Sequence, residues 1–199
     1  MHTVACDTAR KYKYAWRDLS FLGFSQSQCP VCGRKTAEFC YEDGPHRLML
    51  EGGKAYPDLL AYTGAGERML ILSARAVEIF YEEEVTGFSV KEKVMVPEES
   101  GEISSDIPDC FLLSVSGRIE LDLAAMGLKK KKLCPQCGQF EWNRQRVHPL
   151  ILDMAAWDGS DLCRVESIPG YFVCSDRFAE LVNIHGLTGF CVKKLIPNS

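Results

Sequence analysis

The sequence predicts an α+β fold built from two pseudo-repeated strand–helix–strand halves. Residues 70–90 and residues 172–192 are identical at seven of twenty-one positions when aligned without a gap, whereas average composition gives about one match. A Cys-x-x-Cys-Gly motif also occurs twice, at residues 29–33 and residues 134–138. The motif and the repeated segment recur in the same order and at nearly the same spacing, which indicates an internal duplication.

Each copy of the repeat predicts a strand, a helix and a second strand. An apolar triplet opens each copy and suits a short buried strand. Ser73 and Ser175 follow the triplets at the position of a helix N-cap, where a hydroxyl accepts a free amide of the first turn. The helical spacing after Ser175 ends at Gly186, which is placed to close the helix in a left-handed turn. The expected strands are residues 70–72, 88–96, 172–174 and 190–196.

The rest of the chain is assigned by shorter patterns. Alternating aromatic residues at positions 12–16 suit a first strand. Residues 97–109 are acidic and rich in turn formers, and we expect an inter-half linker or a surface loop there. Residues 111–115 and 119–123 flank Ser116-Gly117 and suit a hairpin. The expected organisation is one domain, residues 1–199, with halves at residues 1–96 and 110–199.

The two Cys-x-x-Cys-Gly motifs predict a metal site. Each is typical of a knuckle that directs two thiolates at one point, with a glycine supplying a positive φ. A structural zinc ion binds four such ligands in a tetrahedron, so Cys29, Cys32, Cys134 and Cys137 form one complete site. Thiol redox chemistry and knuckles that have lost their metal are the alternatives.

Other reactive residue types fit no site by their spacing. Cys174 and Cys191 lie in apolar strand patterns and suit buried thiols. His46 and His148 each follow a knuckle and could replace a thiolate, which four available cysteines make unnecessary. The repeated charged residues of the two predicted helices suit solvated or locally paired side chains; they are Arg75, Glu78, Arg177 and Glu180.

Composition is that of a globular protein. Hydrophobic residues make up 46% of the 199 residues and the net charge is −4, which argues mildly against non-specific nucleic-acid binding. Residues 129–132 are four lysines beside the second knuckle, followed by aromatic and basic residues. This segment resembles a nucleic-acid-binding zinc ribbon and supports the alternative of a nucleic-acid adaptor. The sequence shows no membrane span and no export signal, so we expect a cytoplasmic protein.

Several motifs together resemble a known family. The paired CPxCG knuckles occur together with a Tyr-Pro step at residues 56–57 and with three C-terminal segments, at residues 157–164, 175–178 and 187–190. In these features the chain resembles the double-CXXCG motif proteins, a bacterial family that includes immunity proteins of swarming-inhibition toxin systems. The resemblance covers most of the chain, although Cys163 stands where we expect an aromatic residue and residues 91–125 match poorly.

The resemblance implies that the protein binds and neutralises a cognate polypeptide toxin encoded nearby. The residues themselves show no Ser-His-Asp or Cys-His arrangement and no phosphate-binding glycine loop, so we expect no enzymatic activity. Acidic stretches at residues 82–84 and 98–99 would suit a basic toxin, while either stretch taken singly also suits a solvated surface. The sequence predicts no oligomeric state.

Overall fold

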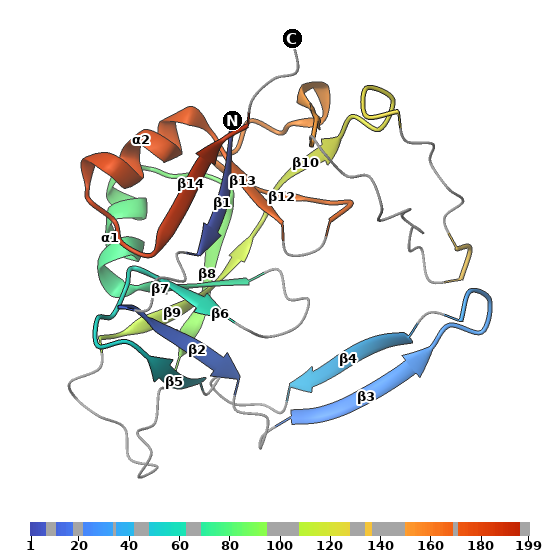
Figure 1. Cartoon of the computed structure of the whole chain (residues 1–199), viewed down its shortest axis with the longest axis horizontal. Coiled ribbons are helices and arrows are strands. Elements are labelled where there is room, and N and C mark those ends of the chain that lie inside the picture. Colours follow the sequence, from blue (N-terminus) through green and yellow to red (C-terminus); the bar gives the residue numbers. More distant parts are fainter. Residues whose placement is uncertain are drawn as a thin grey trace.

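The computed structural model describes residues 1–6, 11–17, 22–33, 35–41, 48–62, 69–94, 108–127, 134–136, 150–168 and 171–195 (Figure 1). Over these residues the fold is mixed α/β and mostly sheet, with α1 (Ala74–Glu82) and α2 (Asp176–Ile184) as its two α-helices. No helix in this part of the chain is long and apolar enough to cross a membrane.

Twelve of the strands form two six-stranded sheets. The first sheet has the order β5 (Leu48–Gly52), β2 (Lys13–Arg17), β6 (Leu59–Tyr62), β7 (Met69–Ser73), β9 (Cys110–Val115), β8 (Phe88–Val94). The second has the order β11 (Leu152–Asp153), β10 (Gly117–Leu121), β12 (Leu162–Val165), β13 (Phe172–Cys174), β1 (His2–Cys6), β14 (Phe190–Lys194). A one-turn 3-10 helix, η3 (Met154–Ala156), follows β11.

A separate hairpin carries the first knuckle. Strands β3 (Leu22–Gln28) and β4 (Lys35–Tyr41) pair antiparallel from Leu22 opposite Tyr41 to Gln28 opposite Lys35. The hairpin lies apart from the two sheets, and its tip approaches the segment at residues 134–136 (Figure 1). The fold therefore presents the first knuckle on an arm between β2 and β5.

Both helices begin where the sequence predicts. The Ser73 hydroxyl accepts a hydrogen bond from the Ala76 amide at 3.1 Å, and the Ser175 hydroxyl accepts one from the Phe178 amide at 3.0 Å. Both N-caps are thus confirmed. Gly186 has φ of 57° just after α2, which confirms the left-handed turn.

The main core joins the two halves of the chain. Phe80 of α1 and Phe178 of α2 are both fully buried, and their ring centroids lie 5.2 Å apart in an edge-to-face arrangement. Residues of β7, β9, β12 and β13 belong to the same buried cluster. The helices therefore pack on each other and on both sheets.

The predicted hairpin after the acidic segment is wrong. β9 pairs with β7 and β8 in the first sheet, whereas β10 pairs with β11 and β12 in the second. At Ser116 the chain crosses from one sheet to the other, and the amides of Ser116 and Gly117 both donate to the carbonyl of Gly87. Because β9 is hydrogen-bonded on both sides, no edge remains for β10.

Two other predictions need adjustment. The strand with alternating aromatics is present as β2, but β1 precedes it, so it is the second strand of the chain. The second strands of the repeat are β8, which is described as far as Val94, and β14, which ends at Lys194 before Leu195; the predicted strand ends Val96 and Ile196 lie outside the described residues. Pro108 and Asp109 lead into β9, while residues 97–107 of the predicted linker lie outside the described residues.

Candidate functional site

The first knuckle is a tight turn at the tip of the β3–β4 hairpin. Its Gly33 amide donates to the Cys29 carbonyl at 2.8 Å, and Gly33 has φ of 69°. The Gln28 side-chain amide donates to the Gly33 carbonyl at 2.9 Å. The positive φ favours glycine at this position and lets the backbone turn about the two thiols.

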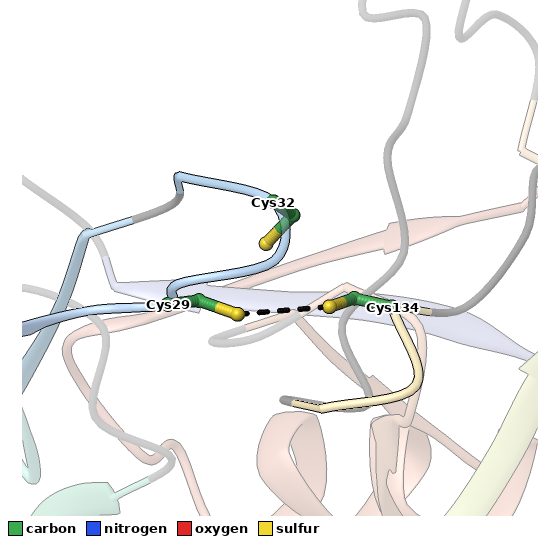
Figure 2. Close-up of side chains that lie close together, drawn as sticks. All are labelled: Cys29, Cys32 and Cys134. Carbon is green, nitrogen blue, oxygen red and sulfur yellow. Dashed lines mark hydrogen bonds between the residues drawn. The ribbon is translucent and has the colours of Figure 1, made fainter.

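Three of the four predicted ligands meet in space. The sulfur atoms of Cys29, Cys32 and Cys134 lie within 4.8 Å of one another, and those of Cys29 and Cys134 are 3.6 Å apart (Figure 2). In a tetrahedral site with metal–sulfur bonds of about 2.3 Å, ligand sulfurs are separated by roughly 3.8 Å. The cluster therefore fits a tetrahedral thiolate site that joins residues 105 positions apart.

The backbone of the first knuckle also favours a negatively charged sulfur at Cys29. Hydrogen bonds from the backbone amides of Cys32 and Val31 lower the pKa of the Cys29 thiol against the effect of burial. Cys29 and Cys134 are buried and Cys32 is exposed. Zinc binds the thiolate form of cysteine. By stabilising the thiolate of Cys29, the backbone amides of the knuckle therefore favour metal binding.

The remaining predicted residues of this region lie outside the described residues. They are Cys137, the alternative ligands His46 and His148, and the lysine segment Lys129–Lys132. Cys137 therefore stays a prediction, as does the nucleic-acid alternative. Among the described residues, the candidate metal site therefore consists of Cys29, Cys32 and Cys134.

Three other cysteines are buried thiols. Burial raises the pKa of Cys110 to about 11 and the pKa of Cys163 and Cys174 to about 12. Cys174 is buried in β13, which confirms the expectation of a buried thiol, whereas Cys191 in β14 is only half-buried. At neutral pH the thiols of Cys110, Cys163 and Cys174 are protonated and therefore weak nucleophiles.

Sequence reasoning missed a buried carboxylate, Asp58, which gathers side chains from both halves. Its two oxygens accept hydrogen bonds from the Ser73 hydroxyl at 2.8 Å, Arg75 at 2.9 Å, and the Thr188 amide and hydroxyl at 2.8 and 2.9 Å. We name Asp58, Ser73, Arg75 and Thr188 the Asp58 cluster. It connects β7 and α1 to the turn before β14.

A matching cluster surrounds Asp161. This carboxylate accepts hydrogen bonds from the Ser175 hydroxyl at 2.8 Å, Arg177 at 2.7 Å, and the Thr86 amide and hydroxyl, both at 3.1 Å. We name Asp161, Ser175, Arg177 and Thr86 the Asp161 cluster. Each cluster thus takes its threonine from the half of the chain that supplies the aspartate of the other.

The clusters hold their carboxylates ionised. Burial by itself would raise the pKa of Asp58 and Asp161, but the hydrogen bonds from threonine and serine, together with the arginine charge, lower both pKa values. The two arginines also donate across the halves, Arg75 to the His185 carbonyl and Arg177 to the Glu83 carbonyl. The expectation of solvated or locally paired side chains agrees with Glu78 and Glu180, which are exposed, but not with the two arginines, whose partners are distant in the sequence.

Two glycines allow the backbones of the two halves to approach each other closely. A Cβ atom at Gly189 would lie 2.2 Å from the Leu59 carbonyl oxygen, and one at Gly87 would lie 2.1 Å from the Leu162 carbonyl oxygen. These glycines follow Thr188 and Thr86 directly, so the Thr-Gly-Phe of each half packs against the Asp-Leu of the other. The repeated Thr-Gly-Phe therefore serves close backbone contact between the halves.

The sequence held a signal for the two aspartates. Asp58-Leu59 and Asp161-Leu162 are separated by 103 positions, and each dipeptide precedes an aligned repeat segment. An alignment extended upstream by one gap would have included them. Comparison with known proteins adds no assignment, because no family model and no curated protein matches the chain.

Proposed function

We propose that this protein is an immunity protein that binds and neutralises a cognate polypeptide toxin in the cytoplasm, stabilised by one structural zinc ion. The observation that carries the proposal is the thiol cluster, in which Cys29 and Cys32 of one knuckle meet Cys134 of the other. Paired knuckles are the main feature by which the chain resembles the double-CXXCG motif proteins.

The zinc part of the proposal adds Cys137 as the fourth ligand. An all-sulfur tetrahedral donor set favours zinc or an iron–sulfur centre over magnesium or calcium. Cys137 stands at the same place in the second knuckle as Cys32 in the first. A closed four-thiolate site leaves no position for substrate, so the zinc would stabilise the fold and keep the β3–β4 arm near residues 134–136.

A binding role agrees with the way the buried polar groups are used. The carboxylates of Asp58 and Asp161 each accept four hydrogen bonds from within the protein. The thiols of Cys163 and Cys174 have raised pKa values. These groups serve the scaffold, and a scaffold with a complementary surface is what toxin neutralisation requires.

The end of α1 is the proposed toxin-facing surface. Glu82 and Glu84 are exposed, and Tyr81, which precedes Glu82 in the chain, is 60% exposed. The Glu83 carboxylate lies 2.8 Å from Nε2 of His185, within hydrogen-bond distance, and so makes a contact within the molecule. Exposed carboxylates beside an exposed aromatic ring suit a basic protein partner, because tyrosine provides contact area and the charges steer encounter.

The test is growth of cells that express the adjacent gene product, with and without this protein, together with affinity capture from the same cells. The proposal predicts rescue and a stable complex, both weakened by a Glu82→Lys/Glu84→Lys variant. Glu180→Lys on α2 is the matched control for the single variants Glu82→Lys and Glu84→Lys, because each makes the same charge change at an exposed position. No rescue and no complex with the unmodified protein would contradict the proposal.

We also propose that the two strand–helix–strand segments descend from one ancestral segment. The buried positions of β7–α1 recur in β13–α2, with Ala76, Val77 and Phe80 aligned to Phe178, Ala179 and Val182. Each segment has a serine N-cap and an arginine bonded to a buried aspartate. Matching burial and matching polar contacts support a common origin.

A further inference from the structure

The two sheets correspond strand by strand along their whole width. Read from β5 and from β11, successive strands are joined by an antiparallel, a parallel and then three antiparallel ladders in both sheets. The correspondence therefore extends beyond the strand–helix–strand segments to strands with no visible sequence similarity. It relates β2 to β10, β5 to β11, β6 to β12 and β1 to β9.

The ladder registers agree as well. Val4 in β1 is aligned with one residue of β13 and one of β14, and Leu113 in β9 is aligned in the same way with β7 and β8. The partners are Phe172 and Val192 for Val4, and Leu70 and Val90 for Leu113. Both partners of Val4 lie 102 positions after those of Leu113, which is the offset of the sequence repeat.

One strand in each sheet comes from the other half of the chain. The first sheet takes β2, β5, β6, β7 and β8 from the first half and β9 from the second. The second sheet takes β10 to β14 from the second half and β1 from the first; Figure 1 shows β1 beside β14. We infer that the chain is two copies of one unit, His2–Val94 and Cys110–Lys194, that have exchanged their first strands.

The connection at Ser116 explains the exchange. If β9 occupied the place of β1 in the second sheet, three strand spacings would separate it from β10, or about 14 Å. Val115 ends β9 and Gly117 begins β10, so the two peptide steps through Ser116 span at most about 7 Å. β9 therefore cannot join the sheet of its own unit, and β1 fills the vacant place in return.

The exchange also accounts for the positions of the two knuckles. In each unit the Cys-x-x-Cys segment lies between the second strand and the third sheet strand, β2 and β5 or β10 and β11. The thiol cluster is then a contact between equivalent segments of the two units, as are the Asp58 and Asp161 clusters. The unit–unit interface is thus the kind that two copies of one chain form by strand swapping.

The test uses the full chain with a specific protease site placed within residues 97–107. Cleavage at this site breaks the covalent connection between the two units. Ala5 of β1 is aligned with the native Cys191 of β14, and Ser89 of β8 is aligned with Ser114 of β9. Ala5→Cys in one variant, and Ser89→Cys with Ser114→Cys in another, provide cross-strand thiol pairs. The thiols are joined with a short bifunctional maleimide before cleavage.

Strand exchange predicts cross-linked peptides between positions 5 and 191 in the first variant and between positions 89 and 114 in the second, identified by mass spectrometry after digestion, because a gel shift alone would also report a link between the native Cys29 and Cys134. The control is Ala5→Cys with Ser89→Cys and Cys191→Ser, which pairs β1 with the edge strand of its own unit. A cross-linked peptide between positions 5 and 89 in this control, with no 5–191 peptide and no 89–114 peptide in the other two variants, would overturn the inference. The readout needs no toxin, so it stands or falls separately from the proposed function.

Discussion

Replacing Asp58 with asparagine tests whether the Asp58 cluster stabilises the contact between the halves. The carboxylate is 7% exposed, and one of its oxygens accepts bonds from Arg75 and from the Thr188 amide and hydroxyl. Asparagine has one oxygen and one NH2 group, so it cannot accept all of the donors that now face Asp58. An NH2 group at the position facing Thr188 would oppose the threonine amide with another donor.

The magnitude follows from the number and exposure of these bonds. A hydrogen bond to a charged group contributes about 1.5–3 kcal/mol, and removing one partner of a buried network costs about 3–5 kcal/mol. Arg75 is 52% exposed, which discounts its share. We therefore expect Asp58→Asn to lower the free energy of unfolding by about 3 kcal/mol, or roughly 6–12 °C in melting temperature.

The assay is urea unfolding followed by circular dichroism, with the metal content held equal between variants. Asp161→Asn should give a similar loss, because its contacts match. Asp153→Asn is the control, since Asp153 caps η3 near the surface and asparagine also caps helices. A loss below about 0.5 kcal/mol for Asp58→Asn, equal to that of the control, would refute the reasoning.

Three other predictions concern the same contacts. Gly189→Ala places a Cβ 2.2 Å from a carbonyl oxygen and should cost at least about 2 kcal/mol more in unfolding free energy than Gly127→Ala, where the φ is also positive but the space is open. Because folding lowers the pKa of Asp161, its stabilisation is full above the unfolded pKa of about 3.9 and is lost as pH falls through the folded pKa; the unfolding free energy of Asp161→Asn should thus fall less steeply below pH ~4, and an unchanged slope would contradict this. Cys163 and Cys174, with pKa values of about 12, should resist iodoacetamide at pH 8 until urea unfolds the protein, and mass spectrometry showing rapid native-state labelling would contradict their burial.

The parts of the fold that the sequence predicts are those with local causes. The serine N-caps, the apolar triplets and Gly186 depend on neighbouring residues only, and each is present in the structure. The cysteine spacing predicts that distant knuckles meet because a tetrahedral metal site needs four ligands. The meeting of Cys29, Cys32 and Cys134 could therefore be predicted without knowing how the strands pair in the sheets.

The parts that the sequence does not predict depend on long-range pairing. The predicted hairpin at Ser116 is wrong because a short connection between two strands is compatible both with a hairpin and with a crossing between sheets. The place of β1 beside β14 is set by ladders between residues near opposite ends of the chain. Asp58 was missed because its partner Thr188 lies 130 positions away and only the fold brings them together.

The most direct test of the central claim, that the two knuckles share one metal ion, is the zinc content of the purified chain and of its Cys29→Ser and Cys134→Ser variants, measured by elemental analysis per mole of protein. A shared site predicts one zinc ion per chain in the unmodified protein and its loss in both variants, since each removes a ligand of the same tetrahedron. Two zinc ions per chain, or a partial zinc content retained in each variant, would show two independent knuckles and contradict the account.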